Sequence, residues 1–314
     1  MIRVNNIHLS LDYDDKSVRK AVAQQLRIEE KSIKSCKIFR RSVDARKKDN
    51  IYFLTTVDAE LNINEEKVCK KCGNAQIARK YEYNQMKFGN APSPIVVGAG
   101  PAGLFAALIL ARSGANPILI ERGRDVDRRT ADVNRFWTSG KLDITSNVQF
   151  GEGGAGTFSD GKLNSGTKDI RQRKVLEEFV SHGAPDEILY NAKPHIGTDM
   201  LKETIKNIRN EIIELGGRVM FETKLVSMAF SDNKLKAITV ETANGDEIIE
   251  TSNVILAIGH SARDTFEMLY DLKLPIEAKP FSVGARIEHL RQKVDKAQYG
   301  RFAGDKKLGS ANYK

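Results

Sequence analysis

Residues 95–123 read IVVGAGPAGLFAALILARSGANPILIERG, and the order of their parts decides the fold class. An apolar run at Ile95–Val97 is followed at once by a G-x-G-x-x-G turn and by a stretch of helical composition up to Arg112. A second apolar run then covers Pro117–Glu121. Strand, glycine turn, helix and strand in this order are typical of the βαβ unit that binds dinucleotides. We therefore predict an α/β, Rossmann-like domain.

Each residue of the glycine turn has a physical reason. Gly98 permits the tight turn, Gly100 lets a pyrophosphate approach the backbone, and Gly103 lets helix and strand pack closely. Pro101 takes the first helical position, where its missing N–H costs nothing, and the free N–H groups of that turn face an anion. Glu121 ends the second strand, where we expect its carboxylate to accept both ribose hydroxyls and to repel the 2′-phosphate of NADP.

Two later segments favour FAD over NAD, which the glycine turn alone does not separate. Residues 148–157, VQFGEGGAGT, form a second glycine-rich loop, and successive N–H groups in such a loop can bind an anion. Residues 198–215 have helical spacing, and an apolar run ending in glycine at 254–259 predicts a buried strand. Between them we predict one strand at 218–221 and a three-strand meander at 225–230, 235–242 and 247–251.

Residues 1–90 predict a small α+β domain that holds most of the positive charge. They contain 19 Lys/Arg and 12 Asp/Glu, a net charge of +7 out of the +9 of the whole chain. Such charge indicates either a solvated face or docking to an acidic partner or polyanion. We predict strands at 2–11, 37–42 and 51–57, one helix capped by Asp14 or Asp15, and another from about Asn64 to Gly73.

The cysteines and the N-terminal residues favour a cytoplasmic protein. Three cysteines do not make a disulfide framework, and the Cys69/Cys72 pair lacks the second pair that a structural zinc site needs. We therefore expect no metal, and an incidental pair rather than a redox dithiol. Residues 1–15 lack the apolar core of a signal peptide, and the apolar stretch 95–111 is too short to span a membrane. No membrane partner is expected.

The order of the predicted elements resembles the FAD-binding fold of glutathione reductase-like flavoproteins. Ala257-Ile258-Gly259 takes the place of that fold's Ala-Thr-Gly-like motif, with Ile replacing Thr. More narrowly, the chain resembles the FAD-dependent, or NAD(FAD)-utilising, dehydrogenases over nearly its whole length. That resemblance rests on Glu121–Gly123, Arg129, Asp132–Val133, Phe136–Trp137, Gly151–Leu163, Gly259–Asp264 and Phe281–His289.

The resemblance implies which residues bind FAD. The pyrophosphate would be held by Gly98, Gly100, Pro101, Ala102 and Gly103, with Gly259 close to it. The adenosine ribose would be bound by Glu121, with Arg122 and Arg129 beside the ribose and phosphates and the Leu225 backbone at the adenine. The flavin side would be lined by Gly153, Gly154, Gly156 and Thr157.

Catalytic residues are not implied by the motifs. His260 and Arg286 are candidates for positions near the isoalloxazine or a carboxylate substrate. Histidine more often serves only as a hydrogen-bonding group, so we leave the catalytic residues unassigned.

Toward its end the chain departs from the pattern of such folds. They usually finish with a late Gly-Asp motif that binds the ribityl chain, whereas Gly304-Asp305 has no strand and helix of suitable length around it. We predict a strand at Phe281–Ile287 that opens a substrate domain too short to complete a sheet. We therefore expect an N-terminal fragment of a longer protein, which alone would bind FAD weakly. The predicted domains are 1–90 (basic α+β), 91–275 (FAD-binding) and 276–314 (incomplete substrate domain).

The resemblance implies an FAD-dependent oxidoreductase, a dehydrogenase, that passes electrons between a small-molecule substrate and the flavin. No second G-x-G-x-x-G lies between a predicted strand and a helix, since the one at 151–156 belongs to the second glycine-rich loop, so NAD(P)H as the electron donor would have to reach the flavin directly. Three alternatives stay open: an NAD-binding Rossmann protein without flavin, a binding module without chemistry, and an RNA-modifying or nucleic-acid-associated flavoprotein. Against the last, residues 1–90 show no RNP1-like run of aromatics and glycines, so nucleic acid is the less favoured partner.

Overall fold

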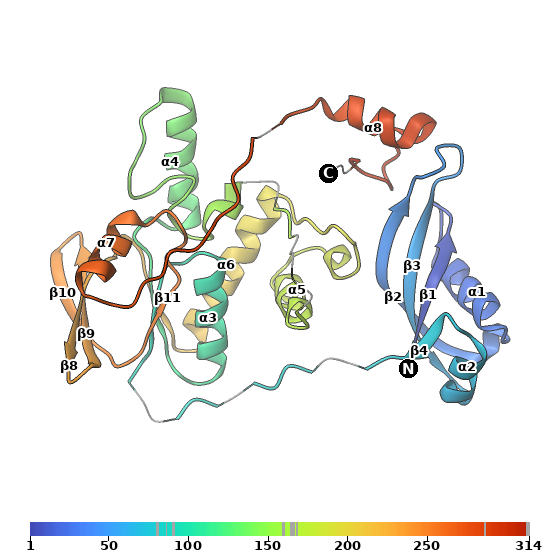
Figure 1. The fold of residues 1–314 in the computed structure, drawn as a ribbon, viewed down its shortest axis with the longest axis horizontal. Coiled ribbons are helices and arrows are strands. Elements are labelled where there is room, and N and C mark those ends of the chain that lie inside the picture. The colour runs from blue at the N-terminus through green and yellow to red at the C-terminus, as the bar shows by residue number, and fades with distance from the viewer. Residues whose placement is uncertain are drawn as a thin grey trace. The chain divides into compact units, whose positions relative to one another are not determined.

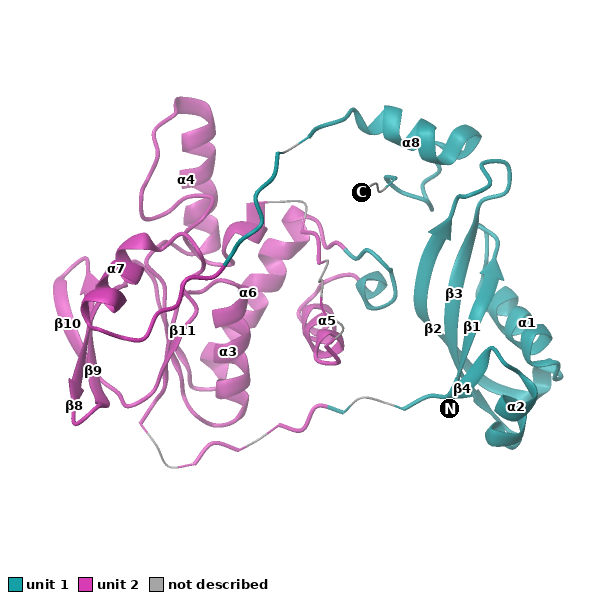
Figure 2. Cartoon of the chain, in the orientation of Figure 1, with its two compact units in different colours: residues 1–82, 186–194, 280–314 teal, residues 83–185, 195–279 magenta. Residues whose placement is uncertain are grey.

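The computed structural model divides into two compact units (Figure 2). Unit 1 comprises residues 1–82, 186–194 and 280–314, and unit 2 comprises residues 83–185 and 195–279. The predicted domain boundaries at residues 90 and 275 stay a prediction, because the two units follow contacts rather than sequence order. The structure describes residues 1–79, 82–85, 87–89, 92–158, 161–163, 167, 169–285 and 287–311.

Unit 2 is built on a parallel sheet, which confirms the Rossmann-like fold. Its strands are β5 (Ile95–Val97), β6 (Ile118–Ile120), β7 (Arg218–Met220) and β11 (Val254–Leu256), and their order is β11-β5-β6-β7. All three pairings are parallel. All residues of β5 and β6 are buried, as expected for strands covered on both faces.

Helices and a meander form the layers on either side of this sheet (Figure 1). The glycine turn leads into α3 (Pro101–Arg112), which packs against α6 (Thr198–Glu214). The predicted meander is confirmed as β8 (Lys224–Ser231), β9 (Lys234–Thr242) and β10 (Gly245–Glu250), three antiparallel strands in the order β10-β9-β8. Apolar side chains of β8 and β9 share one buried cluster with those of β5 and β6.

Three more helices complete unit 2. They are α4 (Val126–Ser139), α5 (Gln172–Ser181) and α7 (Arg263–Asp271), together with a 3-10 turn at Ala155–Phe158. The Asp125 side chain caps the first turn of α4, accepting the N–H groups of Asp127 and Arg128 at 3.1 Å each. The apolar stretch 95–111 divides into β5 and α3. Across the described residues, the structure contains no helix with the length and apolar character needed to cross a bilayer.

The N-terminal part of unit 1 has the order β-α-β-β-α-β, the split βαβ arrangement of ferredoxin-like domains. Its strands are β1 (Ile2–Leu9), β2 (Ile33–Asp44), β3 (Tyr52–Leu61) and β4 (Ala75–Ile77), and they form an antiparallel sheet in the order β2-β3-β1-β4. The predicted cap is Asp14, which accepts the Ser17 N–H at 2.8 Å while the Ser17 hydroxyl accepts the Asp14 N–H. The helices are α1 (Asp15–Leu26) and α2 (Glu65–Lys71), and unit 1 also has 3-10 turns at Glu30–Ser32 and Asp186–Leu189.

The predicted strand at Phe281–Ile287 is wrong for the described residues of that range. No strand is assigned at 281–285 or at 287, and the side chains of Phe281 and Val283 are 85% and 86% exposed. A strand needs a hydrogen-bonded neighbour, and none is paired with this segment among the described residues. The candidate Arg286 lies outside the described residues. Unit 1 ends instead with α8 (Arg291–Tyr299) and a 3-10 turn at Gly300–Phe302.

Candidate functional site

One cavity of about 440 Å³ lies at the carboxyl ends of the parallel strands in unit 2. Ligands of open α/β sheets bind at this edge, outside the carboxyl ends of the strands. The walls come from segments that are distant in sequence but meet here, namely parts of 97–102, 120–122, 149–155, 223–225 and 256–269. The two glycine-rich loops recognised in the sequence therefore border the same cavity.

The first glycine turn is open toward the cavity where a phosphate would need space. Gly98 has φ +101°, and a Cβ there would lie 2.5 Å from the Ala257 carbonyl oxygen. A Cβ at Gly103 would lie 1.8 Å from the Gly98 carbonyl oxygen, which explains the close packing of α3 on the sheet. At Gly100 a Cβ would meet nothing within 4 Å. Gly100 is the N-cap of α3 without a side-chain cap, so the first N–H groups of the helix remain available to an anion.

Glu121 joins the two glycine-rich loops through its carboxylate. Oε2 accepts the N–H of Ala99 in the first loop at 2.7 Å. Oε1 accepts the N–H groups of Gly123 at 2.9 Å and Gly151, in the second loop, at 3.0 Å. Each carboxylate oxygen has two lone pairs, so Oε1 is saturated and Oε2 has one acceptor position left. The side chain is 5% exposed and lines the cavity.

Arg122 lines the cavity with its guanidinium already engaged. It makes a bidentate pair with Asp264 in α7 at 3.0 and 3.2 Å, and it donates to the Thr265 hydroxyl at 2.8 Å. The guanidinium carbon also lies 4.7 Å from the centroid of the Phe150 ring. Asp264 takes a second cation, Lys224, at 2.8 Å. Both cations at this end of the cavity are thus paired with one carboxylate.

Arg129 is fully buried and binds carbonyl groups of the loop that precedes the second glycine motif. Its Nε donates to the Asn147 carbonyl at 2.9 Å, and its two terminal nitrogens donate to the carbonyls of Glu152 at 2.5 Å and Val148 at 3.1 Å. Burial lowers the pKa of Arg129 to about 10. The side chain does not contribute to the lining of the cavity. The structure therefore shows a structural role, and contact with the phosphates stays a prediction.

The second glycine loop touches the first, and only part of it faces the cavity. The Gly153 N–H donates to the Ala99 carbonyl at 2.8 Å, and a Cβ at Gly154 would lie 3.3 Å from the Gly100 Cα. Gly154 lines the cavity, whereas Gly153, Gly156 and Thr157 are not among its walls. Thr157 is buried, and its hydroxyl has no hydrogen-bond partner among the described residues. Contact of Gly153, Gly154, Gly156 and Thr157 with the flavin therefore stays a prediction.

Glu152 is a residue of the site region that sequence reasoning missed. It is fully buried, and its Oε2 accepts the Val126 N–H and an Arg209 guanidinium N–H, both at 2.7 Å. Its Oε1 has no partner in the described part of the chain. Burial raises the pKa of this carboxyl group, against the lowering effect of Arg209. An acidic residue between two glycines of a buried loop is the signal that could have identified it.

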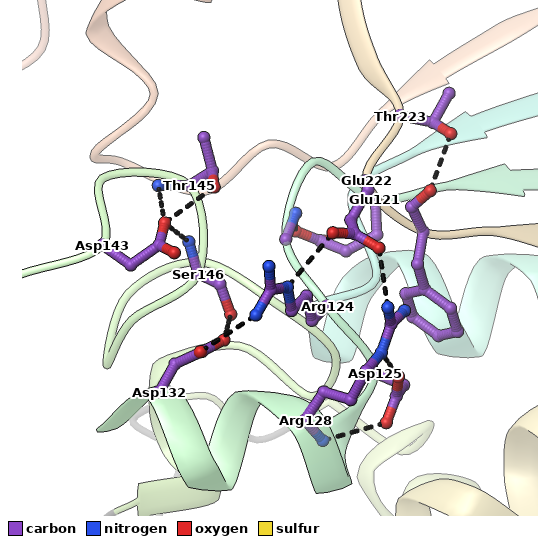
Figure 3. A network of polar contacts seen from close by, with 12 residues as sticks. Glu121, Arg124, Asp125, Arg128, Asp132, Asp143, Thr145, Ser146, Glu222 and Thr223 are labelled. Carbon is purple, nitrogen blue, oxygen red and sulfur yellow. Dashed lines mark hydrogen bonds and ion pairs between the residues drawn. The ribbon is translucent and has the colours of Figure 1, made fainter. Parts of the chain in front are cut away.

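Ion pairs anchor the segment that follows β6 (Figure 3). Arg124 lies between Asp132 of α4 and Glu222 of the turn before β8, at 3.1 Å from each carboxylate. Arg128 also binds Glu222, at 2.8 Å. Backbone bonds run beside these pairs, since the Glu222 N–H donates to the Gly123 carbonyl at 2.9 Å. The wall of the cavity next to Glu121 is therefore fixed from three segments.

Most of the remaining predicted site residues line the cavity. Leu225 and Gly259 line the cavity, as do Gly98, Gly100, Pro101 and Ala102. His260 also lines it, with an exposed side chain whose Nδ1 lies 3.3 Å from the Ser261 hydroxyl. Cys69 and Cys72 are free thiols in unit 1. Among the residues that the structure describes, no group of three or more His, Cys, Asp or Glu side chains could hold a metal ion.

The residues present fit a dinucleotide such as FAD. Gly100 leaves the space of a side chain empty at the first turn of α3, and an acceptor position stays open on Glu121 Oε2 beside it. The cavity continues between the two glycine loops to the apolar side chains of Leu225 and Leu269. A helix N-terminus for phosphates, a hydrogen-bond acceptor for ribose and apolar surface for a ring system are the parts that such a ligand needs.

Family models agree with this fit. Residues 93–132 match the model described as FAD binding domain, and residues 280–314 match the model described as FAD-dependent protein, C-terminal domain-like. Residues 1–60 match a model described as a domain of unknown function. The fold, the site and these matches define a Rossmann-like FAD-binding domain, and FAD is its cofactor.

An uncharacterized protein of Clostridium beijerinckii is similar to the whole chain. It is 45% identical over 318 aligned residues, which cover 100% of this chain and 59% of that protein. The chain thus spans about three fifths of the relative it matches. Among solved structures, the THI4 protein of Thermovibrio ammonificans is 16% identical, with a TM-score of 0.38 over 59% of this chain and 64% of that one. A 3-ketosteroid dehydrogenase of Rhodococcus jostii is 15% identical, with a TM-score of 0.33 over 53% and 48%.

Proposed function

We propose that the protein is an FAD-dependent oxidoreductase that passes electrons between a small-molecule substrate and the flavin. The observation that carries this proposal is the position of Glu121, whose carboxylate holds Ala99 of the first glycine loop and Gly151 of the second at one cavity. When bound, FAD supplies the redox chemistry, while the protein orients the cofactor and sets its electrostatic surroundings.

The residues of the cavity suggest how FAD would be held. The pyrophosphate would lie over Gly100 and the first N–H groups of α3, with Gly259 on the opposite wall. One ribose hydroxyl would donate to the open acceptor position of Glu121 Oε2, which narrows the expectation that both hydroxyls bind there. The adenine would lie toward Leu225, and the flavin toward the loop of Gly154.

The electron donor is proposed to act at the flavin itself. Only one G-x-G-x-x-G of the described chain, at 98–103, lies between a strand and a helix, whereas the match at 151–156 belongs to the loop that borders the same cavity. NAD(P)H would therefore have no second dinucleotide site of the βαβ kind in the described part of the chain. Either NAD(P)H reaches the flavin directly, or the organic substrate reduces it. A cytoplasmic location also remains a proposal, and the three free cysteines support it.

Identification of the bound cofactor tests the proposal. The protein is purified at its natural length, its absorbance is recorded, and the released cofactor is identified by chromatography against FAD, FMN and NAD standards. We expect an oxidised-flavin band near roughly 450 nm, an expectation set by the cofactor's own chemistry, and FAD as the released compound. Anaerobic mixing with NADH, NADPH and candidate substrates then shows which donor bleaches the band. Release of NAD without flavin would replace this proposal with an NAD-binding Rossmann protein.

A further inference from the structure

The positive charge of the chain belongs entirely to unit 1. Its residues include 27 Lys/Arg and 17 Asp/Glu, a net charge of +10, whereas unit 2 has 23 and 24, a net charge of −1. Charge confined to one unit raises the local concentration of anionic partners at that unit. All residues that line the cofactor-binding cavity belong to unit 2.

In the described residues of unit 1, α1 and α2 cover one face of the sheet and no helix of the unit covers the other. Apolar residues such as Ile2, Val57 and Phe53 form a buried cluster with the side chains of α1. Because side chains alternate along a strand, Arg3 and His8 of β1 and Tyr52 of β3 belong to the opposite face. We call this opposite side of the β2-β3-β1-β4 sheet the open face.

Aromatic rings stand on the two central strands of the open face. The rings of His8 and Tyr52 stack with centroids 4.5 Å apart and an interplanar angle of 26°. His8 is exposed and Tyr52 is half-buried. A third ring, Phe39 of β2, carries the Arg3 guanidinium carbon 3.3 Å from its centroid. Rings on adjacent strands of a four-stranded sheet are surfaces on which bases stack in single-strand-binding modules.

Cations lie beside these rings. Lys37 and Arg40 of β2 are exposed, and they pair in register with Asp58 and Thr56 of β3, on the open face. The Arg3 guanidinium is bonded to Asp58 at 2.7 and 2.8 Å, so these two charges offset each other. Lys37, in register with Asp58, adds a further positive charge beside this pair. Exposed lysine and arginine side chains can bind the phosphates of a nucleic-acid strand.

A cavity in unit 1, about 490 Å³ in volume, adjoins the aromatic pair His8 and Tyr52. His8, Tyr52, Asn50 and Phe302 are among its lining residues, together with the carboxylates of Asp12 and Asp305. It therefore offers aromatic walls for the face of a base. Amide and carboxylate groups that can accept or donate at the edge of a base lie next to them.

The hairpin between β2 and β3 brings further cations to this cavity. Arg301 donates to the Asp49 carbonyl at 2.8 Å, which attaches the 3-10 turn of Phe302 to the hairpin. Lys47 and Lys48 of the hairpin are exposed, and Lys48 lies against Gly300. Two segments about 250 residues apart in sequence thus place positive charge at the edge of one aromatic cavity.

We propose that the open face of unit 1 binds single-stranded nucleic acid, with a base against His8 and Tyr52 and phosphates at Lys37 and Arg40. The topology alone would not carry this proposal, because folds of one kind serve many functions. The side chains carry it: stacked rings on the central strands, exposed cations beside them, and a base-sized cavity at the end of the face. An acidic peptide would use the cations but not the rings, so it serves as the competing outcome.

Fluorescence anisotropy of labelled oligonucleotides tests the proposal. The protein at its natural length is titrated into fluorescein-labelled oligouridylate and oligodeoxythymidylate of about 12 nucleotides at several NaCl concentrations. We expect saturable binding that weakens with salt, and the two arms show whether the 2′-hydroxyl contributes. Failure of both oligonucleotides to bind at low salt, with FAD still bound, overturns the inference and leaves the proposed oxidoreductase intact.

Two sets of variants separate stacking from charge. Lys37→Gln with Arg40→Gln should weaken binding about tenfold and reduce the slope of log affinity against log salt by about 1.4, or 0.7 per cation. The matched control, Lys234→Gln with Lys236→Gln on exposed positions of β9 in unit 2, should change neither quantity. His8→Ala should weaken binding about tenfold without a change of slope, and His8→Phe should restore it. Equal binding by His8→Ala and the unchanged protein, or full competition by polyglutamate, would show a site for negative charge alone and overturn the inference.

Discussion

Glu121 Oε1 accepts the backbone N–H of Gly151 at 3.0 Å, across 30 residues of sequence. The other oxygen of the same carboxylate holds Ala99 in the first glycine loop. A residue expected to bind ribose is therefore also the connection between the two loops that border the cavity. Substitution of Glu121 should affect the shape of the cavity as well as its affinity for the cofactor.

Glu121→Gln should weaken FAD binding and lower stability together. The amide nitrogen cannot accept a hydrogen bond, so at least one of the three backbone N–H groups loses its partner inside the protein. A buried unpaired donor costs about 1–3 kcal/mol of unfolding free energy. Urea unfolding and the FAD content of the purified protein measure the two effects. The exposed Glu267→Gln variant in α7 is the control. Weaker FAD binding with unchanged stability would show that Glu121 acts only as a ligand.

Gly151→Ala should be strongly destabilising because this position lacks both the space and the backbone angle for a side chain. Gly151 has φ +116°, and a Cβ there would lie 2.4 Å from Arg129 Cδ. We expect a loss of at least about 1–3 kcal/mol and of bound flavin, measured by thermal unfolding and absorbance. Gly73→Ala, where a Cβ meets nothing within 4 Å and no positive φ applies, should leave both unchanged. A Gly151→Ala protein that is stable and retains its flavin would contradict the close contact between Gly151 and the Arg129 side chain.

Arg129→Lys should lower stability without changing how FAD affinity depends on salt. Lysine cannot reproduce the three bonds that the guanidinium makes to the carbonyls of Asn147, Val148 and Glu152. Hydrogen bonds to a charged group contribute about 1.5–3 kcal/mol, so a loss of that order is expected in urea unfolding. If Arg129 bound the phosphates instead, the lysine variant would mainly alter FAD affinity and its salt dependence.

Asp264→Asn should make the adenosine end of the cavity more receptive to a 2′-phosphate. Burial raises the pKa of Asp264, but hydrogen bonds from Lys224 and Arg122 and the charge of Arg122 together outweigh burial and hold the pKa well below its usual range. This carboxylate is therefore charged and offsets part of the positive charge of the two cations. The variant leaves two cations beside Glu121 with a weaker partner. Calorimetry with ADP and 2′,5′-ADP should show affinity for 2′,5′-ADP rising at least about tenfold relative to ADP.

The control for this substitution is Asp271→Asn, an exposed change at the other end of α7. It should leave the ratio of the two affinities at its original value. An unchanged ratio in the Asp264→Asn protein as well would show that Glu121 alone excludes the 2′-phosphate.

The free energy of unfolding of the unchanged protein should fall as pH rises through the pKa of Glu152, and Glu152→Gln should remove that part of the fall. Burial raises the pKa of Glu152 above 4.5, so between the unfolded and folded pKa values the folded state binds more protons than the unfolded state. The stability that comes from this group is fully present below about pH 4.5 and is lost as pH rises through the folded pKa. Urea unfolding of both proteins between about pH 4 and 8 measures the difference. A stability difference that is constant with pH would show that Glu152 titrates normally.

Much of the fold could be predicted because its signals are local. The strand, glycine turn and helix at Ile95–Arg112, the meander and the cap at Asp14 all follow from periodicity and backbone chemistry within short windows. The strand predicted at Phe281–Ile287 is not formed by the described residues of that range. A strand needs a hydrogen-bonded neighbour elsewhere in the chain, and a local pattern does not show whether that neighbour exists.

The sequence by itself determined the βαβ unit, the second glycine loop and the basic character of the N-terminal part, because these depend on residues that are close neighbours. Only the tertiary structure decided how charged residues are used. Arg129 and Arg122 carry the same charge near one site, but Arg129 is buried against loop carbonyls while Arg122 pairs with Asp264 at the wall of the cavity. Likewise His8 and Tyr52 are 44 positions apart, and antiparallel pairing of their strands makes them one aromatic surface. Contacts between distant segments are set by packing and register, which composition and spacing do not encode.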